Sequence, residues 1–186
     1  MRPILDAVVE LHDCLDAAGM PHAFGGAFAL LWCTGEPRTT VDIDVNIFLV
    51  PEDAQRVLDA LPEEIEPSAD VTAQLMSTGQ CRVMFDRTPV DLFLDTTPFH
   101  ADLRLHLQEH QLADRRIPFL GCNDLAVFKA FFSRRKDWAD IEEMIRANRL
   151  DVPYVAGMLT EYLGADDERI GELLAIRDEV GGPSAS

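Results

Sequence analysis

Two aspartates interrupt a stretch that otherwise has the composition of a buried strand. Residues 41–50 read Val-Asp-Ile-Asp-Val-Asn-Ile-Phe-Leu-Val, and their β-branched, apolar character predicts a central strand of a sheet. Because side chains alternate along a strand, Asp42 and Asp44 project from one face, while Val41 and Ile43 face the other. Two like charges oppose burial unless a cation neutralises them. The stretch is therefore either a solvated edge strand or one wall of a cation site.

A third carboxylate lies in a second apolar segment. Residues 90–94 read Val-Asp-Leu-Phe-Leu, which predicts a strand with Asp91 near its start. Carboxylate oxygens suit Mg²⁺, and a third acid on a neighbouring strand would complete a two-metal site of the kind that transfers phosphoryl or nucleotidyl groups. Asp91 could serve there as a metal ligand or as the general base.

A glycine pair precedes the DxD stretch and opens a predicted helix. Gly25 and Gly26 stand between a short predicted strand, residues 22–24, and an apolar helix, residues 27–33. Glycines let a phosphate approach the backbone, and the N-terminus of a helix offers N–H donors and a positive dipole end. The pair alone is more often a simple turn, but beside three acids it predicts a triphosphate loop.

The order of predicted elements is mixed at first and all-helical at the end. We expect an α/β (α+β) core over residues 1–121, a helical lobe over 122–180 and a flexible tail over 181–186. The remaining predicted helices and strands are a helix at 4–18, a helix opening at Pro51, strands at 81–85 and 117–119, a hairpin link at 86–89, and helices at 124–133, 137–147, 152–163 and 167–179.

Charge and cysteine content narrow the function classes. The net charge is −17, from 16 basic and 33 acidic residues, which disfavours nucleic-acid binding if it is spread evenly. Residues 115–149 instead hold eight basic and five acidic residues, so this segment is either a local phosphate-binding face or a set of solvated helix faces. Four widely spaced cysteines and no apolar run that could span a bilayer predict a reduced, cytoplasmic protein with no membrane segment.

Together these motifs resemble the DNA polymerase β-type nucleotidyltransferase superfamily. The resemblance is carried by Phe-Gly-Gly-Ala at 24–27, Arg-Thr-Thr-Val-Asp-Ile-Asp-Val at 38–45 and Val-Asp-Leu at 90–92. Within the superfamily, the Arg-Thr-Thr-x-Asp-Ile-Asp spelling is similar to the AbiEii and MenT branch of bacterial toxins. That branch also has a later helical lysine, here Lys129, and an element that reads Arg-Lys-Asp-Trp-Ala-Asp at 135–140.

The resemblance implies an enzyme with a polymerase β-type core that uses Mg²⁺ and a nucleoside triphosphate. Asp42, Asp44 and Asp91 would form the catalytic metal site. The other expected site residues are Gly25, Gly26, Arg38 and Lys129 for the nucleotide, with Asp137 and Asp140 organising the far wall. In related toxins the acceptor is the 3′ end of tRNA, and its modification stops translation.

The resemblance also implies a cognate antitoxin, in some systems kinase-like, that phosphorylates a residue just before the DxD. Thr39 and Thr40 occupy that place, although strand residues before a buried segment explain at least one of them. A phosphate there would add nearly two negative charges beside the metal site.

Other interpretations of the same residues remain open. An aminoglycoside-type enzyme would fit the acidic charge, a protein could be the acceptor, and a non-catalytic binding protein could keep the fold. Asp137 and Asp140 could simply cap a helix. His106 and His110 match an inverted zinc-protease pattern, but their polar surroundings and the lack of a third ligand argue against a zinc site.

Overall fold

The computed structural model describes residues 2–181 and divides them into two compact units. Within the described residues, unit 1 comprises 2–28 and 38–120, and unit 2 comprises 29–37 and 121–181. The boundary falls within helix α2, Gly26–Thr34, so this helix begins in one unit and ends in the other.

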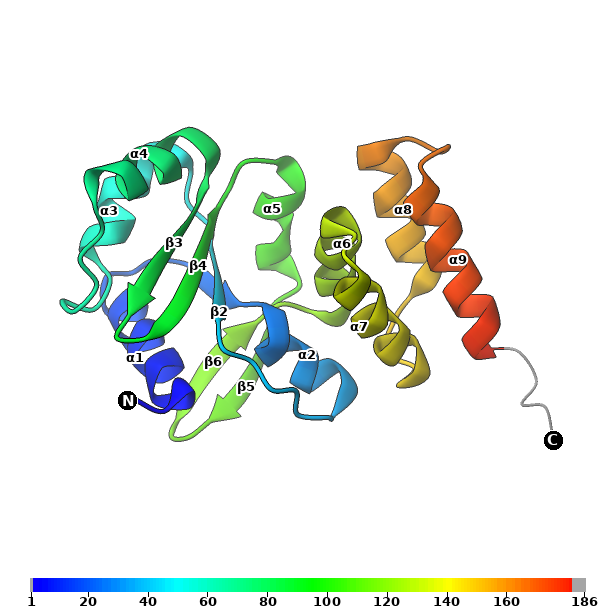
Figure 1. The fold of residues 1–186 in the computed structure, drawn as a ribbon, viewed down its shortest axis with the longest axis horizontal. Coiled ribbons are helices and arrows are strands. Elements are labelled where there is room, and N and C mark those ends of the chain that lie inside the picture. The colour runs from blue at the N-terminus through cyan, green and yellow to red at the C-terminus, as the bar shows by residue number, and fades with distance from the viewer. Residues whose placement is uncertain (1, 182–186) are drawn as a thin grey trace. The chain divides into compact units, whose positions relative to one another are not determined.

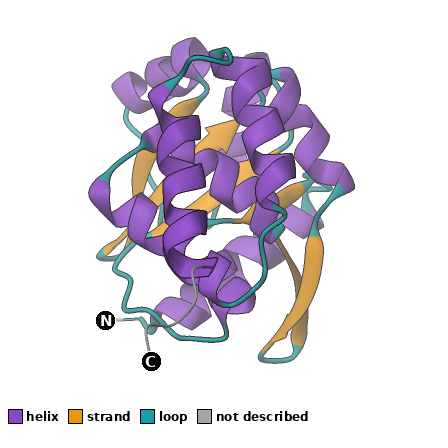
Figure 2. Ribbon diagram, turned by 90° about the vertical axis from the view of Figure 1, so that its right-hand side faces the viewer, coloured by secondary structure: helices purple, strands orange, loops and turns teal. Residues whose placement is uncertain are grey.

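Unit 1 is built on a mixed sheet of six strands in the order β3-β4-β2-β1-β6-β5, coloured orange in Figure 2. The β2–β4 and β1–β6 pairs are parallel, and the other pairs are antiparallel. The strands in the described part of the chain are β1 His22–Phe24, β2 Ile43–Ile47, β3 Gln80–Phe85, β4 Thr88–Leu94, β5 Gln108–Leu112 and β6 Arg115–Phe119. This mixed α/β architecture confirms the predicted fold class.

Alternating side chains give β3 and β4 one apolar face and one polar face. In β3 the buried side chains alternate with exposed ones, and Phe85 is fully buried while Arg82 is exposed. In β4 Leu92 is buried and Asp91 is half-buried on the opposite face. The helical segments of unit 1 are α1 Ile4–Ala17, η1 Pro51–Asp53, α3 Ala54–Asp59, α4 Ala69–Thr78, α5 Pro98–Asp102 and η2 Leu103–Leu105 (Figure 1).

The DxD strand is shorter than the apolar pattern predicts. Strand β2 begins at Ile43, so Asp42 precedes it, and Val41 is 71% exposed instead of buried. The Thr40 hydroxyl donates to the Asp42 main-chain carbonyl at 3.0 Å, and this local bond competes with strand pairing. The two carboxylates therefore lie at the start of the strand and not in its middle.

Strand β5 and the link between β3 and β4 differ from the sequence-based expectations, and helices α4 and α5 lie in segments where no element is predicted. Strand β5 was not predicted, because its residues are polar and its side chains are at least partly exposed as it pairs with β6 at the edge of the sheet. His110 lies in this strand against the ring of Phe119, with 5.9 Å between ring centroids. The predicted link at 86–89 is a two-residue turn, Asp86-Arg87, because β4 already begins at Thr88.

Unit 2 is helical throughout the described part of the chain (Figure 1). It contains the end of α2 and the four helices α6 Cys122–Phe132, α7 Arg135–Arg146, α8 Val152–Leu163 and α9 Glu168–Gly181. These agree with the predicted helices to within a few residues at each end. No helix among residues 2–181 is both long enough and apolar enough to cross a membrane.

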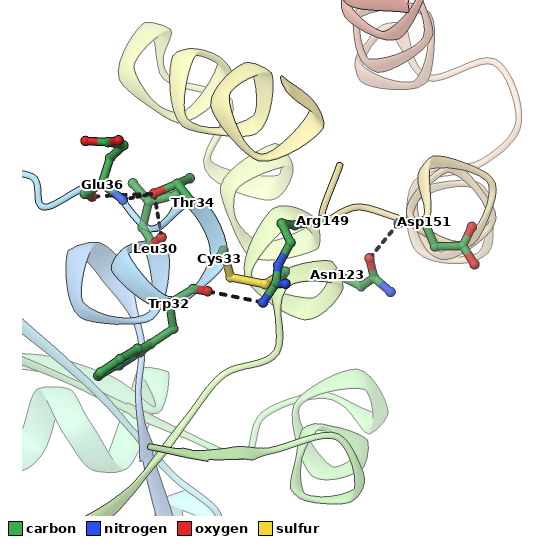
Figure 3. Close-up of a disulfide and its surroundings, with 9 residues drawn as sticks. Leu30, Trp32, Cys33, Thr34, Glu36, Asn123, Arg149 and Asp151 are labelled. Atoms are coloured by element: carbon green, nitrogen blue, oxygen red, sulfur yellow. Dashed lines mark hydrogen bonds between the residues drawn. A yellow bond between two sulfur atoms is a disulfide. The ribbon is translucent and has the colours of Figure 1, made fainter. Parts of the chain in front are cut away.

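A disulfide bond joins α2 to the start of α6 within unit 2 (Figure 3). Cys33 and Cys122 are both buried and are 89 residues apart in the sequence. Beside them the Arg149 guanidinium donates to the Trp32 carbonyl at 3.4 Å. The expectation that all four cysteines are reduced is therefore wrong for this pair, and Cys14 and Cys81 are the free thiols.

We expect the Cys33–Cys122 bond to contribute to stability by restricting the unfolded chain. A cross-link that closes a loop of this length is worth about 4–5 kcal/mol in chain-entropy terms. Dithiothreitol should lower the urea midpoint of the wild type, but not that of Cys33→Ser/Cys122→Ser, and Cys14→Ala should respond like the wild type. An unchanged wild-type midpoint under reducing conditions would contradict this expectation.

Candidate active site

Three charged side chains form one row across neighbouring strands of unit 1. Asp44 of β2 is the register partner of Asp91 in β4, and Asp91 is in turn the partner of Arg82 in β3. Directly paired residues point to the same side of a sheet, so the three side chains share a face. Asp42 precedes the strand, and its carboxylate reaches the same row, 3.8 Å from the Arg82 guanidinium. The structure thus brings together the three predicted carboxylates and adds a guanidinium.

Arg82 forms the strongest contact in this row. Its Nε and Nη2 atoms each donate to one Asp91 carboxylate oxygen at 2.6 Å, and Nη2 lies 3.8 Å from Asp42 Oδ2. Bidentate pairs of this kind are among the stronger charge-assisted hydrogen bonds. The hydrogen bonds and the charge of Asp91 raise the pKa of Arg82 further above its ordinary value, so it stays a cation.

Asp42 is oriented by the loop that precedes it. The Thr40 hydroxyl shares its one proton between the Asp42 carbonyl at 3.0 Å and Asp42 Oδ1 at 2.9 Å, and the Asp42 side chain is 32% exposed. Arg38 and Thr39, which precede Thr40 in the same loop, are exposed. The loop therefore places one hydroxyl directly on a candidate metal ligand.

The glycine pair lies directly against the DxD stretch. Gly25 N–H donates to the Asp44 carbonyl at 2.9 Å, and helix α2 begins at the next residue. Gly26 has a φ of +53°, a left-handed conformation that side chains disfavour. A Cβ atom at this position would also collide with the Asp44 carboxylate. Only glycine therefore allows the backbone at position 26 to pack this closely against Asp44.

The donor set has the chemistry that Mg²⁺ requires. Three carboxylates supply hard oxygen ligands on one face, and the missing side chain at Gly26 leaves the Asp44 carboxylate room. Among residues 2–181, however, no three His, Cys, Asp or Glu side chains already surround a common point. The three carboxylates therefore have the right chemistry for Mg²⁺, while one of them, Asp91, is hydrogen-bonded to Arg82.

Three further predicted site residues, Lys129, Asp137 and Asp140, form a cluster within unit 2. Lys129 of α6 donates to Asp140 at 2.6 Å and lies 3.9 Å from Asp137, both in α7. Asp137 also accepts from the Arg134 main chain and guanidinium at the start of α7, as a capping acid does. Lys129, Asp137 and Asp140 are all buried. The predicted anion-binding lysine is thus held by two carboxylates.

Carboxylates also engage most of the basic residues between 115 and 149. Five of the eight lie within ion-pair distance of an acid: Arg115, Arg116, Lys129, Arg134 and Arg146. Arg135 and Lys136, at the start of α7, are exposed. The positive character that the sequence suggests for this segment is largely neutralised by neighbouring acids.

Structures of similar fold are nucleotidyltransferases. An antigenic nucleotidyltransferase-like protein from Paracoccidioides brasiliensis superposes with a TM-score of 0.60 at 14% identity, over 96% of this chain and 90% of that one. ANT(2″)-Ia in complex with adenylyl-2″-tobramycin gives 0.54 at 13% identity, over 95% and 98% of the two chains. The lincosamide antibiotic adenylyltransferase LnuA, bound to lincomycin, gives 0.52 at 15% identity, over 75% and 94%.

The chain shares its fold with these nucleotidyltransferase structures, and a family match gives the same class of protein. Residues 23–177 match the family of nucleotidyltransferases of unknown function designated DUF6036, and the chain belongs to that family. No curated protein matches the chain.

We expect Gly26→Ala to disrupt the site by two effects that a control variant separates. The left-handed backbone costs an alanine about 1 kcal/mol, and this cost applies equally to Gly19→Ala, where φ is +64° and a Cβ meets nothing within 4 Å. At Gly26 the methyl group must also displace the Asp44 carboxylate, and a shift of this kind can reduce turnover by about 100-fold.

The two effects can be measured by thermal unfolding and by nucleotide transfer. Gly19→Ala should lose stability alone, while Gly26→Ala should lose more stability and most of its activity. Equal losses of stability and activity in the two variants would show that the contact with Asp44 is unimportant.

Proposed function

We propose that this protein transfers a nucleoside monophosphate from a nucleoside triphosphate to a hydroxyl group, with Mg²⁺ held by Asp42, Asp44 and Asp91. The observation that carries this proposal is the placement of the three carboxylates on one sheet face, against the Gly25-Gly26 backbone at the start of α2. When bound, the metal would screen the triphosphate and lower the pKa of the attacking hydroxyl.

The residues of the chain would then act as follows. The backbone at Gly25 and Gly26 and the N-terminus of α2, a nine-residue helix, would bind the phosphates, since the first N–H groups of a helix have no partner within the helix. The acceptor oxygen would attack the α-phosphorus, and pyrophosphate would leave. Asp91 would receive the hydroxyl proton or share the metal. Arg38 and Lys129 are the proposed phosphate contacts, with Asp137 and Asp140 holding Lys129.

The charge of the protein favours a small, cationic hydroxyl compound as the acceptor. The net charge is −17, and most basic residues of the 115–149 segment already face acids. Such a surface attracts a polycation and repels a polyanion. An aminoglycoside is the representative compound, and ANT(2″)-Ia, of similar fold, was solved with an adenylylated one.

The second candidate acceptor is the 3′ end of tRNA, in a toxin controlled by an antitoxin. It is supported by the Arg-Thr-Thr-Val-Asp-Ile-Asp sequence at 38–44 and by the hydrogen bond from Thr40 to Asp42. A phosphate on Thr40 would remove that donor and place negative charge against a metal ligand. Thr39 is the neighbouring alternative. The cytoplasm, where triphosphates and tRNA are present, is the proposed location.

The reaction is tested with each α-labelled triphosphate and Mg²⁺, offered with an aminoglycoside panel or with total tRNA. Label should appear in one acceptor and be lost in Asp42→Asn/Asp44→Asn, while the exposed-acid control Asp70→Asn should behave as the wild type. Arg135→Glu/Lys136→Glu reverses charge on exposed residues. It should abolish labelling of tRNA and spare that of a cationic compound.

Each result of this assay decides between the proposed functions. Label in an aminoglycoside supports the small-molecule function, and label in tRNA supports the toxin. Label in a co-purified protein would identify a protein acceptor. Binding of triphosphate without transfer to any acceptor would favour a non-catalytic binding protein and reject the proposed reaction.

A further inference from the structure

We infer that Arg82 is a resident cation that occupies the place of a divalent ion at Asp91 until the metal displaces it. This inference rests on the proposed function, because it concerns the same carboxylate row. It assigns a role to a residue outside the predicted set of site residues. The role is to set how much metal the enzyme needs.

The geometry places the guanidinium where a metal would bind. Arg82 donates to both oxygens of Asp91 at 2.6 Å and reaches towards Asp42 Oδ2 at 3.8 Å. It therefore spans two of the three carboxylates that the metal must share. A divalent ion that uses the same Asp91 oxygens must move the guanidinium away or bind beside it against charge repulsion.

The position of Arg82 in the fold allows it to leave. Strand β3 is at the edge of the sheet, and the Arg82 side chain is 56% exposed, while that of Asp91 is only 19% exposed. Solvent screens an ion pair with one exposed partner, so a divalent ion can displace the guanidinium at a moderate cost. The same pair compensates the negative charge of the row while no metal is bound. Arg82 thus stabilises the site in the absence of metal and competes with the metal for Asp91.

The test is a direct binding measurement on the nucleotide-free, full-length protein. Mn²⁺ replaces Mg²⁺ as the probe, because free Mn²⁺ can be counted by electron paramagnetic resonance. Arg82→Gln should bind Mn²⁺ roughly tenfold more tightly than the wild type, since a positive charge within about 5 Å of the ion is removed. Arg82→Lys, which keeps the charge, should stay near the wild type. Arg87→Gln removes an exposed arginine from the turn of the same hairpin and should have no effect.

The outcomes distinguish this inference from the proposed function. Asp42→Asn/Asp44→Asn should abolish Mn²⁺ binding in every background, which identifies the site that is measured. Equal or weaker Mn²⁺ binding by Arg82→Gln, with the wild type still binding, would overturn the role of Arg82 and leave the proposed reaction standing. If neither the wild type nor Arg82→Gln binds Mn²⁺, the proposed metal site fails, and this inference fails with it.

Discussion

The charge balance of the row Asp44–Asp91–Arg82 is the constraint on which the site depends. The parallel register of β2 and β4 makes the two aspartates direct neighbours, and Asp42 adds a third negative charge on the same face. Like charges in paired positions destabilise a sheet unless something neutralises them. Arg82 supplies one positive charge from the edge strand, so the row keeps an excess of negative charge. That excess of negative charge is what would attract the proposed divalent cation to this face.

The second constraint is the close approach of the backbone at Gly26. Strand β1 pairs with β2 on the side away from β4, and the chain leaves β1 directly beside Asp44. A positive φ at Gly26 starts helix α2 at that point. The positive end of the α2 dipole and the carboxylates therefore lie at the same edge of the site. A phosphate bound to the helix and a metal bound to the carboxylates would each neutralise the charge of the other.

Much of this arrangement can be predicted from sequence, because it rests on local patterns. The alternation in residues 41–50 and 90–94 predicts both strands and the shared face of Asp42 and Asp44. The apolar spacing after residue 121 predicts the helices of unit 2. The patterns fail where the backbone is controlled by a polar contact, as at Thr40 and Asp42, or where an edge strand such as β5 carries no apolar alternation.

The pairing of Arg82 with Asp91 shows how a small error in a predicted turn hides a contact of the candidate site. A four-residue link at 86–89 would pair Phe85 with Val90 and place Arg82 opposite Phe93. The actual two-residue turn pairs Phe85 with Thr88 and moves Arg82 opposite Asp91. Asp86 adopts a φ of +55° in this turn, a conformation that aspartate tolerates better than most residues. Asp86 is therefore the residue that favours the two-residue turn. Pro89 disfavours it, because it places a proline inside β4.

The buried cluster in unit 2 cannot be inferred in the same way. Lys129, Asp137 and Asp140 lie on two helices, and each residue alone fits a solvated or capping role. Only tertiary packing makes Lys129 face both acids, and removing one partner would leave an uncompensated buried charge. A buried lysine that is paired with two acids has no positive charge available for an incoming phosphate unless one acid turns away. The proposed contact of Lys129 with a nucleotide would therefore require a rearrangement of α7 side chains, whereas the metal proposed for the carboxylate row would require only that Arg82 withdraw.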